Sequence, residues 1–269
     1  MKQTIIGYHR DEREDWVAEL SCGHGSHVRH EPPFADRPWV VTVAGRQSML
    51  GFSLECLKCE SSAYEVDAFR WQPISPSDVA KIMSGFGAPW WIAGGWAIDL
   101  FLGKHTRIHY DTDILVLRRD QNLLYEHLHD WQLHKAHSGT LTRIESGDFL
   151  EEIGDVWCRS GDDKPWAFQV MLMNTQSDNW VYKRCPEIRG PISEIGFQTA
   201  DGIPYLKPAI QLLYKAKSET IEKDRHDFEH ASAHLNSAER LWLMDGLRQQ
   251  FGEGHEWIDY LEEIGDKSP

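Results

Sequence analysis

The stretch from Trp90 to Leu117 constrains the fold of this chain more than any other part of the sequence. A short apolar run stops at Gly94-Gly95, apolar residues then recur at helical spacing, and a second apolar run follows a pair of aspartates. Two adjacent glycines let the backbone turn sharply and approach another group closely, because neither has a Cβ atom. The pattern predicts a buried strand, a helix that ends at a glycine and a second strand, over residues 89–93, 96–103 and 110–117.

The two aspartates, Asp111 and Asp113, stand two residues apart at the start of the second predicted strand. Side chains at i and i+2 of a strand point to the same face, where two carboxylates repel each other and are costly to bury. A divalent cation removes both problems, and Mg²⁺ prefers one or two carboxylates together with phosphate oxygens. The backbone N–H groups of Gly94 and Gly95, beside a helix start, can hold such a phosphate. The basic residue Arg107 is close by in the sequence.

This stretch resembles the nucleotidyltransferase superfamily that includes DNA polymerase β, and within it the aminoglycoside and lincosamide nucleotidyltransferases. The resemblance covers about residues 77–260 and rests on short motifs in a fixed order. These motifs are Gly94-Gly95-Trp96-Ala97-Ile98-Asp99, Leu102-Gly103, Thr106-Arg107-Ile108-His109 and Asp111-Thr112-Asp113. The resemblance implies an α+β fold, in which a mixed sheet has flanking helices and is followed by C-terminal helices.

The same resemblance implies an activity. A nucleoside monophosphate would move from ATP, or another nucleoside triphosphate, to a hydroxyl of a small molecule such as an aminoglycoside or lincosamide antibiotic. Two Mg²⁺ ions would be held by Asp111 and Asp113, and the phosphates would lie over Gly94 and Gly95. Arg107 would contact a phosphate or orient Asp113. Catalysis of this kind is mostly positioning and charge stabilisation.

Two further positions bear on this activity. A helix predicted over residues 209–218 carries Lys215, at a place where the resembling enzymes commonly use a lysine to hold the triphosphate; the alternative is a solvated basic helix face. A strand predicted over residues 166–173 carries Gln169 where those enzymes have a third carboxylate that often serves as the base. An amide cannot usefully accept a proton.

Gln169 therefore leaves three alternatives open. Another acid, such as Glu151 or Asp155, serves as the base, or the acceptor hydroxyl needs little help, or the activity is weak. A different class of function follows from the last of these, namely a catalytically inactive module that acts as a nucleotide sensor or a protein-binding scaffold. Two more strands are predicted nearby, over residues 140–144 and 149–153.

Residues 1–60 are predicted to form a separate, small, β-rich domain, with strands over residues 4–8 and 15–20. It contains the motifs Cys22-Gly23-His24-Gly25-Ser26-His27-Val28-Arg29-His30, Pro32-Pro33-Phe34, Arg37-Pro38-Trp39 and Cys56-Leu57-Lys58-Cys59. With these motifs it resembles a small bacterial domain of uncharacterised function. Thiolates and an imidazole at Cys22, Cys56 and Cys59, with His24 or His27 as the fourth ligand, are suited to a structural Zn²⁺. The alternative is buried thiols and surface histidines. Polar residues 61–76 are predicted to be a linker to the nucleotidyltransferase domain, residues 77–269.

The formal charge of −14 argues against a general nucleic-acid binder, which would have a basic surface. It is compatible with a cationic small molecule as substrate, and equally with an ordinary acidic protein. No apolar run is long enough to span a bilayer, and the first residues lack the apolar core of a signal peptide. We therefore expect a cytoplasmic protein, and the sequence leaves its oligomeric state open.

Overall fold

The computed structural model describes residues 2–11, 14–30, 36–56, 59, 70–137, 140–145, 147–217 and 221–266. The chain divides into two compact units, of which the first comprises residues 1–68 and 136–142 and the second residues 69–135 and 143–269. Most of the linker predicted over residues 61–76 lies outside the described residues. The domain boundaries drawn from the sequence stay predictions.

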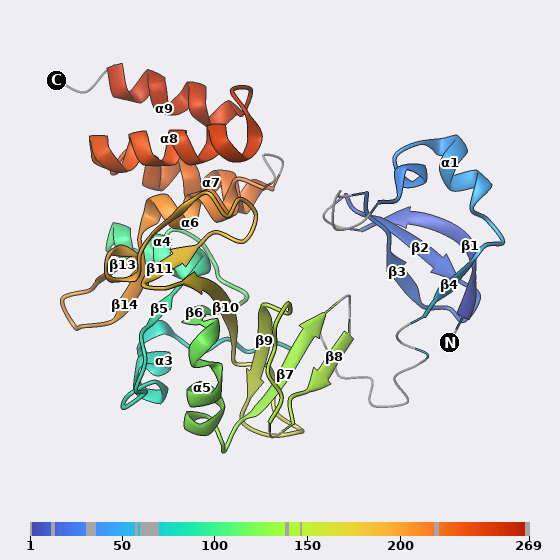
Figure 1. Cartoon of the computed structure of the whole chain (residues 1–269), viewed down its shortest axis with the longest axis horizontal. Coiled ribbons are helices and arrows are strands. Elements are labelled where there is room, and N and C mark those ends of the chain that lie inside the picture. The colour runs from blue at the N-terminus through green and yellow to red at the C-terminus, as the bar shows by residue number, and fades with distance from the viewer. Residues whose placement is uncertain are drawn as a thin grey trace. The chain divides into compact units, whose positions relative to one another are not determined.

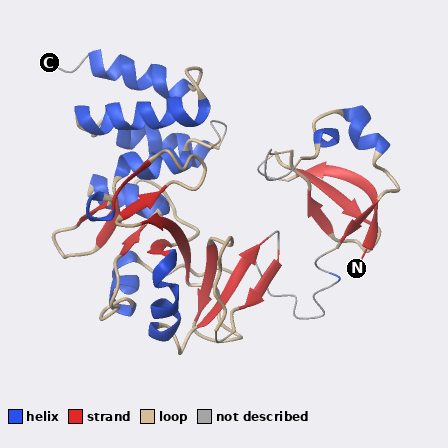
Figure 2. Cartoon of the chain, viewed as in Figure 1, coloured by secondary structure: helices blue, strands red, loops and turns tan. Residues whose placement is uncertain are grey.

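The first unit contains an antiparallel sheet of four strands in the order β3-β2-β1-β4 (Figure 2). The strands are β1 (Lys2–Arg10), β2 (Trp16–Leu20), β3 (Gly25–His27) and β4 (Ser53–Glu55), and two short helices, η1 (Pro38–Val40) and α1 (Val43–Ser48), precede β4. The predicted strands over residues 4–8 and 15–20 are confirmed as parts of β1 and β2. The buried core is small, and consists of Ile5, Ala18, Leu20, Val28, Val40 and Cys56 among the described residues.

A second sheet is mixed, which agrees with the predicted α+β class, and most of its strands belong to the second unit. Its main path runs β13-β14-β5-β6-β10-β9-β7-β8; off this path, β11 pairs with β10 and β12 pairs with β11. The strands are β5 (Trp90–Ile92), β6 (Asp113–Leu117), β7 (Gln132–His137), β8 (Thr140–Arg143), β9 (Asp155–Arg159), β10 (Phe168–Gln176), β11 (Asn179–Val181), β12 (Arg189–Pro191), β13 (Gly196–Gln198) and β14 (Pro204–Leu206). β6 pairs antiparallel with β5 and parallel with β10, so the predicted strands around the glycine turn lie at the centre of the sheet.

Helices cover both sides of the central strands, as Figure 1 shows. They are α3 (Pro76–Ile82), α4 (Gly94–Leu102), α5 (Gln121–His127), α6 (Pro208–Lys215), α7 (Glu222–Ser232), α8 (Ser237–Phe251) and α9 (Glu256–Asp266), with 3₁₀ turns η2 (Arg118–Asp120) and η3 (Ile192–Glu194). α4 packs against α6 and α7, α6 packs against α8, and α8 packs against α9. None of the helices that the structure describes combines the length and the apolar composition needed to cross a membrane.

Local sequence explains where several helices begin and end. The hydroxyl of Ser75 accepts from the Asp78 amide at the start of α3, where Pro76 occupies the first turn. Asn236 and Glu239 form a reciprocal capping box at the start of α8. α4 ends at Gly103 as predicted, because the cap residue has φ +64°, which glycine adopts at little cost.

The strand predicted over residues 149–153 is wrong. The neighbouring strand, β9, begins only at residue 155. The buried guanidinium of Arg118 donates from Nη1 to Leu150 O and to Ile153 O, each at 2.7 Å. These carbonyls are therefore bonded to a side chain instead of a neighbouring strand, and the segment forms a turn wrapped around Arg118.

Candidate active site

Asp111 and Asp113 come together at the start of β6. Thr112, between them, is fully buried, and its hydroxyl donates to Ile74 O at 2.7 Å. Because side chains alternate along an extended chain, this anchor directs the two carboxylates to the other side. The pKa of Asp113 is raised to about 7, first by burial and then by the negative charge of Asp111. A cation shared by the two carboxylates would favour their ionised forms.

The glycine turn gives these acidic and basic side chains room to approach α4. Gly94 has φ +63°, and a Cβ atom there would overlap Asp113 Oδ2. A Cβ atom on Gly95 would overlap Arg107 Nη2 and the ring of His109. The glycines are therefore required for the close approach of three side chains to the first turn of α4.

The start of α4 differs in one respect from the prediction of free amides. The Gly94 N–H donates to Gln211 Oε1 of α6 at 2.8 Å, so this amide already has a protein partner. Among the described residues, no side chain caps α4 at its N-cap, Ala93. The N-terminal end of a helix carries partial positive charge, which favours the nearby carboxylate of Asp113.

Arg107 and Lys215 share one buried carboxylate, that of Asp227 in α7. Arg107 forms a two-point ion pair with it, Nε to Oδ1 at 2.7 Å and Nη2 to Oδ2 at 2.8 Å. Lys215 Nζ lies 2.8 Å from the same Oδ2 and 2.7 Å from Asp224 Oδ1. Both basic residues reach the candidate site, but each is held by protein carboxylates.

The charges in this network stabilise one another. Burial disfavours the ionised form of Asp227, but the hydrogen bonds from Arg107 and the charge of Lys215 outweigh burial and lower its pKa. Burial likewise opposes the charge on Lys215, whereas the carboxylates of Asp227 and Asp224 outweigh it and raise its pKa. Asp227 and Lys215 are therefore ionised at neutral pH, as buried and paired charges require.

A second network fixes the loop that carries Arg107. The Thr106 amide and hydroxyl donate to Asp99 Oδ1, at 3.2 and 2.5 Å, and His109 Nε2 lies 2.6 Å from Asp99 Oδ2. The ring of His109 stacks on Trp96 with a centroid distance of 4.3 Å. Burial lowers the pKa of His109 although the bond to Asp99 opposes this. These contacts explain why Thr106 and His109 flank Arg107 in the motif.

Gln169 stands where the sequence predicts the third-acid position. It is paired in register with Asp113 across the parallel strands β6 and β10, so the two side chains share a face. Its amide Nε2 donates to Asp155 Oδ1 of β9 at 3.1 Å. The charge of Asp155 also raises the pKa of Asp113. Of the two alternative acids, Asp155 therefore lies beside Gln169, while Glu151 lies in the turn around Arg118.

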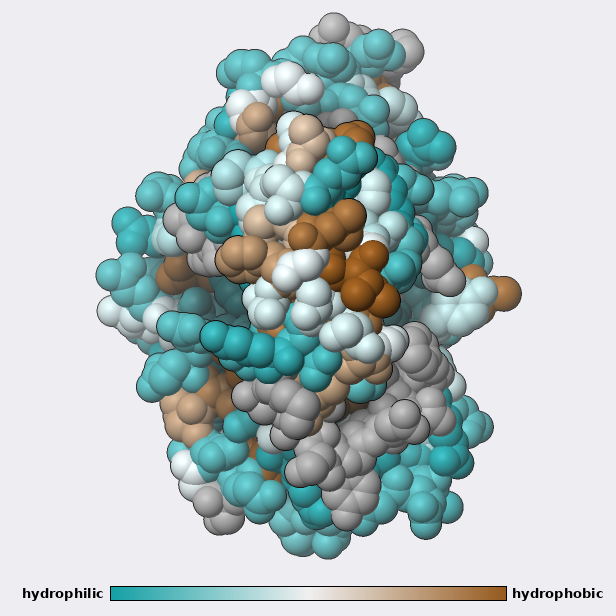
Figure 3. Space-filling model, turned by 90° about the vertical axis from the view of Figure 1, so that its right-hand side faces the viewer, coloured by the Kyte–Doolittle hydropathy of each residue, from teal (hydrophilic) through white to brown (hydrophobic). Residues whose placement is uncertain are grey.

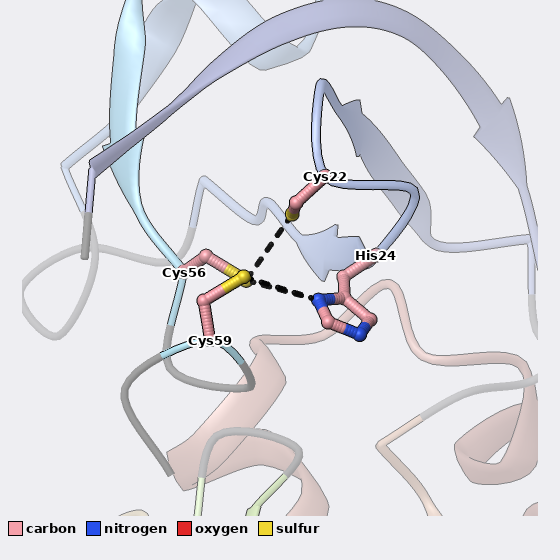
Figure 4. A group of neighbouring side chains, drawn as sticks. All are labelled: Cys22, His24, Cys56 and Cys59. Carbon is pink, nitrogen blue, oxygen red and sulfur yellow. Dashed lines mark hydrogen bonds between the residues drawn. The ribbon is translucent and has the colours of Figure 1, made fainter. Parts of the chain in front are cut away.

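The first unit gathers most of the predicted zinc ligands. One ligand atom from each of Cys22, His24, Cys56 and Cys59 lies within 4.8 Å of all the others, as drawn in Figure 4. His27, the alternative fourth ligand, does not join them, because its Nε2 pairs with Asp11 Oδ2 at 2.8 Å.

Sequence reasoning assigned no role to three residues that complete the site, Gln211, Asp224 and Asp227. A signal for the two aspartates was present, because positions i and i+3 of the motif Lys223-Asp224-Arg225-His226-Asp227 share a helix face. What the spacing could not reveal is the partner, since Arg107 lies 120 residues earlier in the chain. Lys223 was also passed over; it is exposed, and its positive charge lowers the pKa of Asp113 against the larger effect of burial.

The solved structures that match this chain are distant from it in sequence. The solution structure of the antibiotic-resistance factor ANT(2'')-Ia is 14% identical, with a TM-score of 0.44 over 71% of this chain and 95% of that one. The lincomycin-bound crystal structure of the lincosamide antibiotic adenylyltransferase LnuA is 16% identical, with a TM-score of 0.43 over 60% and 98%. An antigenic nucleotidyltransferase-like protein from Paracoccidioides brasiliensis is 13% identical, with a TM-score of 0.41 over 69% and 89%.

Sequence families are more specific. No curated protein matches the chain. Residues 6–63 match the profile of a family described as a protein of unknown function (DUF3565). Residues 77–187 match the profile of the family described as aminoglycoside-2''-adenylyltransferase. The glycine turn, the loop around Arg107, Asp111 and Asp113 all lie within that second match. This match spans 111 of the 269 residues, and over these residues the chain is similar to the aminoglycoside-2''-adenylyltransferase family.

Proposed function

We propose that the chain transfers a nucleoside monophosphate, most simply AMP from ATP, to a hydroxyl of an aminoglycoside or lincosamide. The observation that carries this proposal is the carboxylate of Asp113, which packs against the glycine turn at the start of α4 and whose pKa is raised by the nearby charge of Asp111. The family match over residues 77–187 supports the same reaction class.

The residues present fit a magnesium-bound triphosphate. Asp113 is an acid of raised pKa beside a second acid, and such a pair is relieved by a hard cation with oxygen ligands. Mg²⁺ held by Asp111 and Asp113 would neutralise phosphate charge and lower the pKa of the acceptor hydroxyl. We assign the triphosphate to the amides of Gly95 and Trp96 at the start of α4, because Gln211 already occupies the amide of Gly94.

The basic residues divide between positioning and phosphate binding. Arg107 is a positioning residue, since its guanidinium is engaged by Asp227 and fixes the loop beside Gly95. Lys215 forms ion pairs with two carboxylates, so we assign it no direct contact with the phosphates; its positive charge acts on the site from a buried position. Exposed Lys223, whose charge acts on Asp113, is our choice for direct contact with the triphosphate.

Asp155 is our choice for the base. Its side chain is exposed, as a group that must meet an acceptor has to be, and the amide of Gln169 holds it by Oδ1. The acceptor oxygen would attack the α-phosphorus, pyrophosphate would leave, and the hydroxyl proton would pass to Asp155. Gln169 cannot act as the base itself, because its side chain is an amide, but its hydrogen bond positions Asp155. Asp155→Asn is expected to lower kcat with little change in KM, whereas the control Glu151→Gln keeps kcat.

The acceptor class follows from charge as well as from the family. Exposed acids Glu151 and Glu152 lie in the turn just before Asp155, where they would attract the amino groups of an aminoglycoside. A neutral or anionic acceptor would gain nothing from them. Raising the salt concentration is therefore expected to raise KM for the acceptor more than for the nucleotide.

A direct test incubates the full chain with radiolabelled nucleoside triphosphates and Mg²⁺ against panels of aminoglycosides, lincosamides, RNA and proteins. We expect a labelled antibiotic, and its loss in Asp111→Asn and Asp113→Asn, each with an unchanged circular dichroism spectrum. Asp163→Asn is the matched control, because Asp163 is an exposed aspartate outside the site. Near-full activity of Asp111→Asn would exclude the two-carboxylate mechanism.

A second function, a nucleotide sensor or scaffold without turnover, is favoured by one observation. Gln169 occupies the strand position paired with Asp113, so that position cannot supply a base. Calorimetry separates the two proposals. Binding of Mg²⁺–ATP that depends on Asp113, without transfer to any acceptor in the panel, would favour the sensor.

A further inference from the structure

The topology of the first unit brings four soft ligands to one end of its sheet. Cys22 and His24 lie in the turn between β2 and β3, and Cys56 directly follows β4. The β2–β3 turn and the segment after β4 lie close together because β1 is between β2 and β4. The first residues of β1 pair with the last residue of β2 and with the last residue of β4. The Ser21 amide donates to Thr4 O at 2.8 Å, and Lys2 is paired with Glu55.

The turn itself is shaped to present its two ligands. The Gly23 amide donates to Leu20 O at 2.8 Å, and the Leu20 amide donates to His24 O at 3.0 Å. Gly23 has φ +82°, a conformation that glycine adopts without strain. Cys22 and His24 thus project from either side of a tight, internally bonded turn toward Cys56 and Cys59, as Figure 4 shows.

Distances within the group match those of a tetrahedral metal site. Cys22 Sγ lies 3.6 Å from Cys56 Sγ, and His24 Nδ1 lies 3.5 Å from Cys56 Sγ and 3.4 Å from Cys59 Sγ. Ligands at about 2.3 Å (sulfur) and about 2.0 Å (nitrogen) from a tetrahedral Zn²⁺ would place sulfurs about 3.8 Å apart and sulfur and nitrogen about 3.5 Å apart. A disulfide instead requires about 2.05 Å between sulfurs.

A metal at this place would stabilise a unit whose hydrophobic core is small. The hydrophobic core of this unit has six buried residues among those described, and Cys22 and Cys59 pack against it. A core of that size is marginal, and small domains commonly add a metal or disulfides. Three thiolates and an imidazole select zinc over magnesium or calcium, and four protein ligands leave no open position for catalysis.

We propose that Cys22, His24 through Nδ1, Cys56 and Cys59 bind one Zn²⁺ in a closed structural site. The metal fastens the β2–β3 turn to the segment that follows β4. This site is independent of nucleotidyl transfer. The other described group with metal-ligand spacing is Asp99, His105 and His109, and it is not a rival, because both oxygens of Asp99 already accept hydrogen bonds from within the loop.

The test is the zinc content of the purified full chain, by plasma mass spectrometry, after growth with zinc and removal of loosely bound metal. We expect one zinc per chain in the wild type. Two matched controls keep it: Cys185→Ser, a cysteine outside the group, and His27→Ala, the histidine paired with Asp11. Cys56→Ser and His24→Ala are expected to lose at least nine-tenths of the zinc.

A spectroscopic measurement covers variants that fail to fold. Cobalt added to metal-free wild-type chain is expected to give the strong visible bands and sulfur charge-transfer absorption of a tetrahedral thiolate site. Zinc should then displace the cobalt. A metal-free wild type that gives octahedral cobalt spectra would overturn the proposal. So would equal zinc loss in His27→Ala and His24→Ala. Neither readout involves nucleotide, so failure here leaves the proposed transferase untouched, and the reverse also holds.

Discussion

Gly94 cannot carry a Cβ atom, because Asp113 Oδ2 already occupies that place. The carboxylate thereby comes close to the start of α4, where partial positive charge favours it. The glycine pair was predicted as a phosphate cradle. In the structure, the absence of Cβ atoms on the two glycines leaves space for the side chains that form the site.

Gly94→Ala tests this account against a control with the same backbone conformation. Gly103 has φ +64° and open space around it, so Gly103→Ala carries only the cost of a left-handed alanine, about 1–2 kcal/mol. Gly94→Ala adds displacement of Asp113. We expect a larger loss in urea-induced unfolding free energy and, because a misplacement of this kind can cost about 100-fold, at least that loss in transfer rate. Equal behaviour of the two variants would contradict the overlap argument.

Asp227 is the second residue on which the site depends. Asp227→Asn leaves Arg107 and Lys215 facing each other without the carboxylate they share. Breaking a buried ion pair by removing one partner costs about 3–5 kcal/mol, and we expect a loss of that order in denaturant unfolding. Asp224→Asn is the matched control. It removes one contact to Lys215 and should cost on the order of 1–3 kcal/mol.

At the scale of elements, the register between neighbouring strands determines which side chains meet in the site. In β6 and β10 the parallel pairing sets Gln169 beside Asp113, and a one-residue slip would turn one of them to the other face. α6 adds its part through helical spacing. Gln211 and Lys215 are four residues apart, so one face of the helix reaches the glycine turn and, one turn later, the carboxylates of α7.

Strand β7 offers a pH test at this scale. His134 is 5% exposed, and its ring lies edge-on to Trp166. Burial first, and then the charges of Arg159 and Arg143, lower its pKa to about 4. The unfolded chain binds this proton near pH 6.5, so the folded state loses stability as the pH falls from 6.5 toward 4, by up to about 1.4 kcal/mol per unit. Above pH 6.5 the contribution is fully present.

Unfolding free energies of wild type and His134→Gln between pH 7 and 4 check this expectation. The variant should lose less stability than the wild type over that interval. His137→Gln, which replaces an exposed ring on the same strand, should follow the wild-type curve. Parallel curves for wild type and His134→Gln would show that protonation of the buried ring does not contribute to the loss of stability at low pH.

The sequence predicted those parts of the fold whose signals are local. The apolar runs on either side of Gly94-Gly95 and the spacing of Asp111 and Asp113 are local patterns, and the structure contains the strands and helix they predict. The prediction failed over residues 149–153, because a strand-like composition says nothing about Arg118 taking the carbonyls. The sequence also could not predict the partners of Arg107 and Gln169, because each partner lies on a different element, away from them in the sequence.

At the scale of the molecule, the two units carry different chemistry. The second holds the carboxylates and the glycine turn, and the first holds the cysteine and histidine ligands. Figure 3 shows a surface on which hydrophilic residues predominate, with apolar residues gathered in a small central area. The acidic balance of the chain, −14, is compatible with the proposed cationic acceptor, and equally with an ordinary acidic protein.

Thermal unfolding of the full chain should separate these units. Mg²⁺–ATP at about 100 times its dissociation constant stabilises the state that binds it by about 2.7 kcal/mol, and we expect it to raise one calorimetric transition. A zinc-selective chelator should lower a different transition. Calcium with ATP omitted serves as the control for ionic strength. Both ligands acting on one transition would mean that the two units unfold together.

The pairing of Arg107 with Asp227 spans 120 residues of chain. During synthesis the glycine turn, Asp111 and Asp113 therefore leave the ribosome well before α7, whose Asp227 holds the Arg107 loop in place. Until α7 has emerged and packed against this loop, the carboxylate of Asp227 is not in place to pair with Arg107. Shortened products that stop before α7 lack Asp227, and we expect them to show none of the proposed transfer activity.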